Sequence, residues 1–335
     1  MMDATFVLQK GILDELYIRE DEFKNFLEFI KKYFRDYTLI TDFNNEREFI
    51  LFSEENPLLE LLLDKFNQIQ FVSDLSNILE NKDLLKLSSK RTIVLSMLSD
   101  KICNDYLSSH GILFFNLSLL KNWELYSDII LSKSLKVTKD NAIPPKMRFV
   151  SFKCISRFFK HCDSIVLFDK YVFSNKSNQL LINNLYVFIE SILELNEIID
   201  IMIISEFKGN DITKQYYELK KYLDQKGYSK YNLNLVHHCK AFYPRNFEGL
   251  HSRFILSNYI HVRSNDSFNF FKENGDFNNL ADIDIKFSLT RDNSHSYFKD
   301  LQAIREYISR VKNEPKCPKD ELKITFYKNK LSALI

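Results

Sequence analysis

The chain has 335 residues, enough for two domains, because single hydrophobic cores stop growing near roughly 250–300 residues. Its 46 basic and 45 acidic residues give a net charge of +1, which argues against nucleic-acid or membrane binding through overall charge. Five scattered cysteines without a Cys-x-x-Cys pair argue against a disulfide framework or a thiolate zinc site and favour a reducing cytoplasm. No stretch approaches the ~20 apolar residues of a membrane span, and no cofactor is expected.

The first 140 residues alternate between strand-like and helix-like patterns, which predicts an α/β domain of unknown type at 1–140. Strands are expected at 5–8, 37–42, 49–52, 69–72, 91–96 and 111–116. Helices are expected at 11–34, 57–66 and 99–109, the last of them ended by Gly111.

Several acidic residues of this first domain could collect at the ends of the predicted strands. They are Asp14, Glu15, Asp42, Glu55, Asp64 and Asp100. Gathered together, such carboxylates bind divalent metals, as in the small metal-dependent ribonucleases of the PIN type. Acids near helix starts are more often solvated caps, so a metal-dependent nuclease here is an alternative hypothesis.

A polar segment that ends in Pro144-Pro145 indicates a domain boundary between residues 131 and 147. A second domain is therefore predicted at 146–312, followed by a C-terminal extension at 313–335 with a strand at 322–327. Within the second domain, strands are expected at 164–168, 198–205 and 232–237, and helices at 178–195, 213–226 and 301–311. This order predicts a mixed sheet flanked by helices.

The stretch 249–271 combines the side chains best suited to bind or cleave a phosphodiester. His251 and Arg253 are two residues apart on a predicted strand and therefore point to the same face. Histidine can attack phosphorus or transfer a proton, and the arginine fork binds phosphate oxygens. Asn258 and Asn269 are candidates to orient the ring or the anion. Nearby basic and aromatic residues suit a nucleic-acid strand: Lys240, Phe242, Tyr243, Arg245, Tyr259 and Arg263.

The spacing of these residues resembles the phospholipase D superfamily motif. That motif reads His-x-Lys, four residues, Asp, six residues, Gly-Ser-x-x-Asn; here His251 and Asn269 match, while Arg253 replaces Lys and Asn258 replaces Asp. The superfamily's Gly-Ser is absent, and one copy of the motif is visible where the superfamily brings two together.

A closer resemblance is to the phospholipase D-like C-terminal domain of microtubule-interacting-and-transport (MIT) proteins. It covers residues 148–312 through Asp169-Lys170-Tyr171, Asn183-Asn184, His251-Ser252-Arg253-Phe254-Ile255 and Phe270-Phe271. The resemblance implies a site made of His251, Arg253, Asn258, Asn269 and Asp169. It also predicts that His251, Arg253 and Asp169 lie together.

The resemblance implies two different activities. The superfamily's enzymes cleave phosphodiesters through a histidine nucleophile, whereas the MIT-type branch binds anionic groups. Arg253 and Asn258 favour binding, because neither side chain can take the superfamily role unchanged; whether the chain is an enzyme stays open.

The favoured hypothesis is a nucleic-acid-directed protein of a bacterial defence or conflict system. The alternative is a non-enzymatic adaptor that binds a protein partner or an anionic lipid. A homodimer or a partner protein is expected. A structural ion pair of Arg253 with Asp169 or Glu248 is the competing role for that side chain.

Overall fold

The fold is α/β, as the sequence predicts, with one parallel and one mixed sheet, each flanked by helices. The computed structural model describes residues 4–33, 37–87, 92–121, 135–137, 151–160, 162–173, 177–196, 198–206, 212–238, 253–277, 283–288 and 291–313. The chain divides into two compact units: unit 1 is Met1–Leu131 with Ser288–His295, and unit 2 is Ser132–Phe287 with Ser296–Ile335. None of the described helices is both long and apolar enough to cross a membrane.

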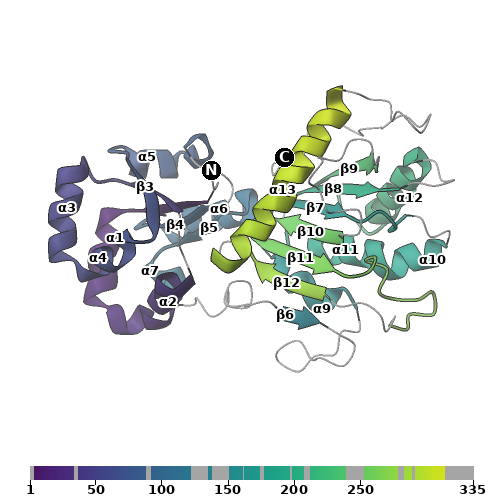
Figure 1. Ribbon diagram of the computed structural model, residues 1–335, viewed down its shortest axis with the longest axis horizontal. Helices are drawn as coiled ribbons and strands as arrows, with labels where there is room; N and C mark the ends of the chain where they lie inside the picture. Colours follow the sequence, from purple (N-terminus) through teal and green to yellow (C-terminus); the bar gives the residue numbers. More distant parts are fainter. Residues whose placement is uncertain are drawn as a thin grey trace. The chain divides into compact units, whose positions relative to one another are not determined.

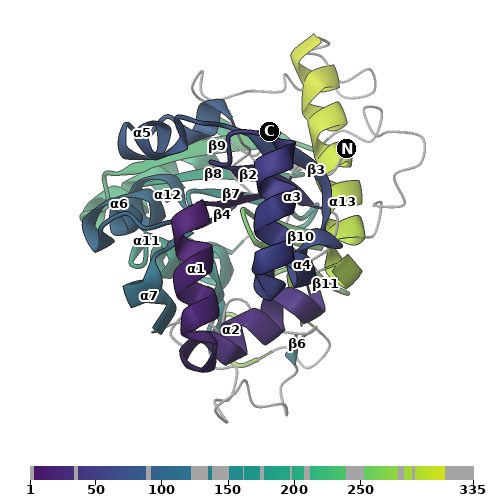
Figure 2. The same cartoon turned by 90° about the vertical axis from the view of Figure 1, so that its left-hand side faces the viewer.

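Unit 1 contains a five-stranded parallel sheet in the order β3-β2-β1-β4-β5 (Figure 1). Its strands are β1 (Thr5–Leu8), β2 (Tyr37–Thr41), β3 (Phe66–Phe71), β4 (Thr92–Leu95) and β5 (Leu113–Phe115). Its helices are α1 (Lys10–Ile18), α2 (Glu20–Tyr33), α3 (Glu46–Glu55), α4 (Pro57–Leu63), α5 (Leu75–Glu80), α6 (Asp100–His110) and α7 (Leu117–Lys121). Helices α1, α3 and α4 lie on the side of the unit that faces the viewer in Figure 2. The apolar side chains of α5 and α6 pack with those of β1, β2, β4 and β5.

Two of the predicted elements of unit 1 are wrong. Residues 49–52 are not a strand but part of α3, because the Asn45 side chain accepts a hydrogen bond from the Glu48 amide (3.0 Å) and so caps a helix. The single helix expected at 11–34 is two helices, broken at Arg19, and the acidic residues at the start of α2 favour a new helix N-terminus there.

Unit 2 contains a seven-stranded sheet in the order β6-β12-β11-β10-β7-β8-β9. Its strands are β6 (Leu135–Val137), β7 (Ser164–Phe168), β8 (Ile199–Ser205), β9 (Tyr231–His237), β10 (Arg253–Ser257), β11 (Ile260–Ser264) and β12 (Ile283–Phe287). Strands β7, β8 and β9 are parallel, and the remaining neighbours are antiparallel. Strand β10 therefore joins an antiparallel half to a parallel half.

Much of the predicted boundary at 131–147 and the whole of 314–335, with the strand expected at 322–327, lie outside the described residues. The described part of the boundary is β6, which pairs with β12. The predicted first domain, 1–140, includes β6, whereas the structure places this strand in unit 2.

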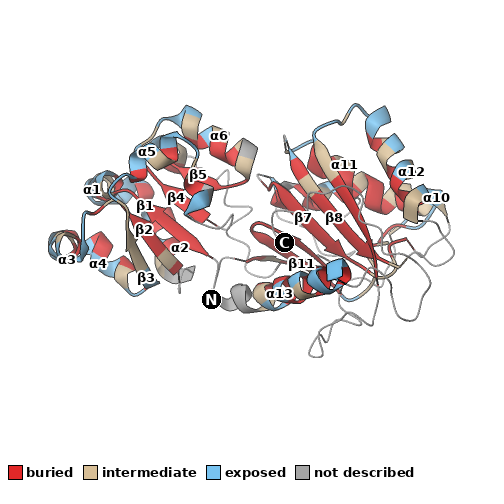
Figure 3. Ribbon diagram, turned by 90° about the horizontal axis from the view of Figure 1, so that it is seen from above, coloured by how far each residue is buried: buried red, intermediate tan, exposed pale blue. Residues whose placement is uncertain are grey.

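Helices cover both faces of the unit 2 sheet. They are α9 (Lys153–Ser156), α10 (Asn178–Leu181), α11 (Val187–Leu193), α12 (Ile212–Gln225) and α13 (Arg291–Asn313). Helix α13, predicted only at 301–311, packs Tyr297, Leu301, Ile304 and Tyr307 onto alternate residues of β7, β8, β9 and β10. The strands are buried and the outer face of α13 is exposed (Figure 3).

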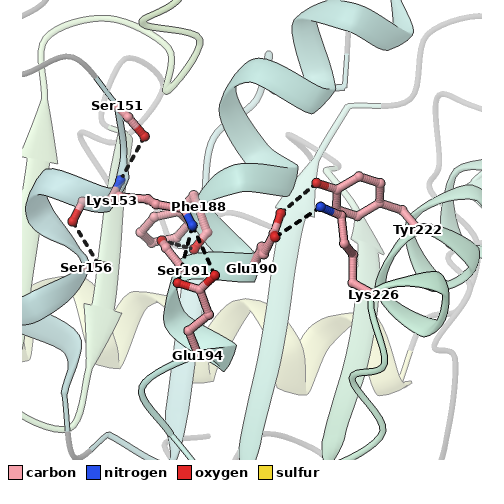
Figure 4. A network of polar contacts seen from close by, with 9 residues as sticks. All are labelled: Ser151, Lys153, Ser156, Phe188, Glu190, Ser191, Glu194, Tyr222 and Lys226. Carbon is pink, nitrogen blue, oxygen red and sulfur yellow. Dashed lines mark hydrogen bonds and ion pairs between the residues drawn. The ribbon is translucent and has the colours of Figure 1, made fainter.

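A polar network ties the helices together on the face opposite α13 (Figure 4). Glu190 of α11 accepts a hydrogen bond from the Tyr222 hydroxyl (2.7 Å) and pairs with Lys226 (3.3 Å). Burial opposes ionisation of Glu190, but these two partners prevail and lower its pKa. Lys153 of α9 pairs with Glu194 (3.0 Å), so α9, α11 and α12 are held as one layer.

A second polar contact fixes α13 to the sheet. The imidazole Nε2 of His261, on β11, lies 3.0 Å from Oδ2 of Asp300, which Arg263 also binds (2.7 Å). Burial lowers the pKa of His261, and the neighbouring Asp300 carboxylate only partly opposes this. Its Nδ1 has no hydrogen-bond partner among the described residues, so protonation would leave a buried donor unsatisfied.

Acidification should therefore weaken unit 2. The folded pKa of His261 is below its unfolded value of about 6.5, so the stabilising contribution is present above that pH and is lost as pH falls towards the folded pKa. Between pH 7.5 and 5.5 we expect this residue to account for roughly 1 kcal/mol of lost unfolding free energy. Urea unfolding of His261→Gln should show a smaller loss, whereas His110→Gln in unit 1 should match the wild type; equal losses in all three proteins would contradict the assignment.

Candidate functional site

The site begins at the carboxyl end of β7, where Asp169 follows a fully buried strand. Its Oδ1 accepts a hydrogen bond from the Tyr171 amide (2.8 Å), and its Oδ2 accepts from the Ser267 hydroxyl (2.7 Å) and the Phe268 amide (2.6 Å). The side chain is completely buried. Burial raises the pKa of Asp169, although the three hydrogen bonds and the positive charge of Arg253 act in the opposite direction.

The turn after β11, residues 265–277, is held by two adjacent asparagines. Asn184 donates to the carbonyl of Phe271 (2.7 Å) and accepts from the amide of the same residue (2.8 Å). Asn183 donates to the carbonyls of Lys272 and Glu273 (2.8 and 3.0 Å). Both asparagines lie in a π-helical segment, Ile182–Tyr186, of the kind often found at functional sites. In the sequence these asparagines stand out only as part of a family pattern, and no local signal predicts that they hold the turn.

Arg253 opens β10 directly beside this turn. Since Phe254 pairs with Phe168, Arg253 lies opposite Asp169 in the antiparallel register. Its Nη1 donates to the carbonyl of Asn265 (3.0 Å), and its guanidinium carbon lies 5.3 Å from the centre of the Tyr171 ring. The guanidinium is thus held by a backbone carbonyl and an aromatic ring, and remains half-buried rather than enclosed.

Asn269 belongs to the same cluster. Its amide nitrogen is 3.3 Å from the Ser267 hydroxyl and 3.4 Å from the Tyr171 carbonyl. Its Oδ1 is buried and has no hydrogen-bond partner among the described residues. A buried acceptor without a partner costs free energy, and such costs are concentrated at functional sites.

Lys170 adds a second cation at this edge. Its ammonium nitrogen lies 5.0 Å from the centre of the Tyr171 ring and 3.6 Å from Glu206. The tyrosine ring therefore contacts both Lys170 and Arg253. Together these residues place positive charge and hydrogen-bond donors at the carboxyl end of β7, where open α/β sheets usually bind ligands.

Asn258 lies elsewhere. It follows β10 in the short hairpin turn to β11 and is completely buried. Its amide donates to Asp163 (2.8 Å) and accepts from the Asp163 backbone nitrogen (3.3 Å), at the opposite end of β7 from Asp169. It is five residue steps along the chain from Arg253, which is about 17 Å in a strand. Asn258 is therefore not part of the site around Arg253. The spacing of a motif does not show where a strand ends, and here the strand places Arg253 and Asn258 at its opposite ends.

The structure brings together three of the five predicted site residues. Arg253, Asn269 and Asp169 are brought together, whereas His251 lies outside the described residues. Of the predicted basic and aromatic patch, Tyr259 is buried against Phe287, whereas Arg263 binds Asp300 with 40% of its side chain exposed. The other four members of the patch also lie outside the described residues.

The acids proposed for a metal site in unit 1 do not form such a site in the described part of the chain. No three His, Cys, Asp or Glu side chains there are placed to hold a metal ion. Asp42 accepts a hydrogen bond from the Lys10 amide (2.6 Å) at the start of α1. Asp100 accepts from Asn116 (2.6 Å) and Ser118 (3.3 Å). Asp42 therefore caps the start of α1, and Asp100 fixes the side chains of Asn116 and Ser118.

Removing the Asn184 amide should destabilise unit 2. In Asn184→Ala the buried amide and carbonyl of Phe271 both lose their partner, so we expect a loss of about 3 kcal/mol in the free energy of unfolding. Asn183→Ala is the matched control: its carbonyl partners belong to exposed residues, and the loss should stay below about 1 kcal/mol. Urea unfolding measures both, and equal losses would contradict the role given to Asn184.

Comparison with known proteins does not place this chain in a family. No protein-family model and no curated protein matches it. The phospholipase D-like resemblance therefore stays a prediction drawn from residue spacing, and its functional consequences belong to the proposal that follows.

Proposed function

We propose that unit 2 recognises a phosphodiester of nucleic acid at the carboxyl end of β7 without cleaving it. The observation that carries the proposal is the position of Arg253, whose guanidinium is fixed between the Tyr171 ring and the Asn265 carbonyl. A planar guanidinium held in this way has less conformational freedom to lose when it binds an anion.

The distribution of charge supports an anionic polymer as the ligand. Residues 1–131 contain 14 Lys and Arg against 22 Asp and Glu, whereas residues 132–335 contain 32 against 23. The net charge of +1 for the whole chain therefore conceals an acidic first part and a basic second part. A basic domain attracts nucleic acid over distances beyond any single contact.

Two features favour recognition over cleavage. Asn258, which stands for the superfamily's Asp, is committed to Asp163 at the other end of the strand. The Asp169 carboxyl is buried and already accepts three hydrogen bonds, so it is not placed to assist a histidine nucleophile. A role in a bacterial defence or conflict system is proposed only because of the phospholipase D-like resemblance.

Binding of a fluorescein-labelled 20-nucleotide single strand, followed by fluorescence anisotropy, tests the proposal. We expect Arg253→Ala to weaken binding about tenfold and to lower the slope of log affinity against log salt by about one. Arg310→Ala is the control, because it removes the same charge from an exposed position of α13. Equal effects of the two substitutions would contradict a specific site at Arg253 and indicate attraction by overall charge.

Incubation with the same oligonucleotide also separates recognition from hydrolysis. The proposal expects the strand to remain intact on a denaturing gel. Cleavage that is lost in His251→Ala would show that recognition alone is the wrong function. Binding of vesicles with anionic lipid in preference to the oligonucleotide would favour the lipid-binding adaptor instead.

A further inference from the structure

The exposed edge of the unit 1 sheet is a surface that the proposed function does not use. The strand order places β3 at that edge, and β2 is its only hydrogen-bonded neighbour among the described strands. All six residues of β3, FNQIQF, are uncharged and half-buried or exposed. The opposite edge, β5, has three residues and all are buried.

Exposed edge strands normally carry features that prevent pairing with another chain. Lysine, proline, inward-facing charges and bulges are the usual ones. Strand β3 has no charge and no proline, and its one bulge is at Asn67, near its start, where Tyr37 pairs with Phe66 and Thr38 with Gln68. Residues Gln68 to Phe71 are in regular register with β2 and have no second strand partner among the described residues.

We propose that a second copy of this chain pairs with β3 antiparallel, in a register centred on Ile69. In that register Ile69 lies opposite Ile69 of the second copy, and Gln68 lies opposite Gln70 of the second copy. Directly opposite residues share a face of the sheet, so the two glutamines form amide pairs on one face and the isoleucines meet on the other. The strand is therefore complementary to itself.

The absence of charge on β3 favours a second copy of the chain as its partner over a charged peptide. Unit 1 is acidic, so two copies repel one another over most of this part of the chain. The six uncharged residues of β3 form a strip on which two copies can approach without placing like charges together. Nothing in this strip would select a charged extended peptide.

Helix α3 adds apolar surface next to the same edge. The ring of Phe49 contacts that of Phe71 (5.8 Å between centroids), which places α3 beside the end of β3. The two residues that follow Phe49, Ile50 and Leu51, are 48% and 53% exposed. A strand pair alone buries less than the ~1,600 Å² of a standard interface, and this adjoining helix supplies further contact.

Charge exchange at the glutamines tests the register. Sedimentation velocity of the full chain should show a dimer that forms with rising concentration. Gln68→Glu/Gln70→Glu puts carboxylates opposite one another twice, and Gln68→Lys/Gln70→Lys does the same with ammonium groups, so each variant should dimerise about tenfold more weakly. Mixing the two variants should restore a dimer, detected as a heterodimer by native mass spectrometry.

The control variant replaces two glutamines with glutamates at positions outside β3. Gln225→Glu/Gln302→Glu adds two negative charges at exposed positions of α12 and α13 and should leave dimerisation unchanged. Melting temperatures establish that each variant is folded. A chain that stays monomeric at all concentrations, a dimer indifferent to the charged variants, or a mixture that fails to form heterodimers would each overturn the proposal.

Discussion

The buried carboxyl of Asp169 is the contact on which the carboxyl edge of unit 2 depends. A carboxylate can be buried only where donors replace water, and here Ser267, Phe268 and Tyr171 supply three. Two of these donors come from a turn almost a hundred residues later in the chain. Arg253 lies opposite Asp169 in the adjacent strand and donates to the Asn265 carbonyl of the same turn, so the strand end, the turn and the guanidinium are connected.

Strand β7 is clamped in the same way at its other end. Asp163, immediately before the strand, exchanges two hydrogen bonds with Asn258 in the β10–β11 hairpin. The antiparallel half of the sheet is thus fastened to β7 by one aspartate at each end, with the five buried residues of the strand between them. Such a double attachment fixes the register of β10, and the register decides that Arg253 lies opposite Asp169. The asparagine that motif spacing assigns to catalysis therefore has a structural role.

The sequence predicts a parallel strand well where that strand is a short apolar run bounded by polar residues. The run SIVLF, for example, coincides with β7 at Ser164–Phe168. Strands β11 and β12 are not predicted, although IHVRS and IDIKF both alternate apolar and polar residues. The link between Asn184 and Phe271 spans 87 residues, and no local pattern reports such a contact. Propensity also fails at α3, where the apolar Phe49 to Phe52 indicates a strand until the Asn45 cap is considered.

The net charge of the whole chain also conceals how its charges are distributed. A chain with 46 basic and 45 acidic residues appears indifferent to polyanions, yet the excess of acid lies in the first 131 residues and the excess of base in the remainder. Electrostatic attraction acts over about a Debye length, roughly 8–10 Å, and therefore responds to each unit rather than to the sum. An acidic unit repels both nucleic acid and its own copies, so contact with either is confined to places where that charge is absent. For the nucleic acid that we propose as ligand this is the basic unit 2, and for the proposed second copy it is the uncharged strip of β3.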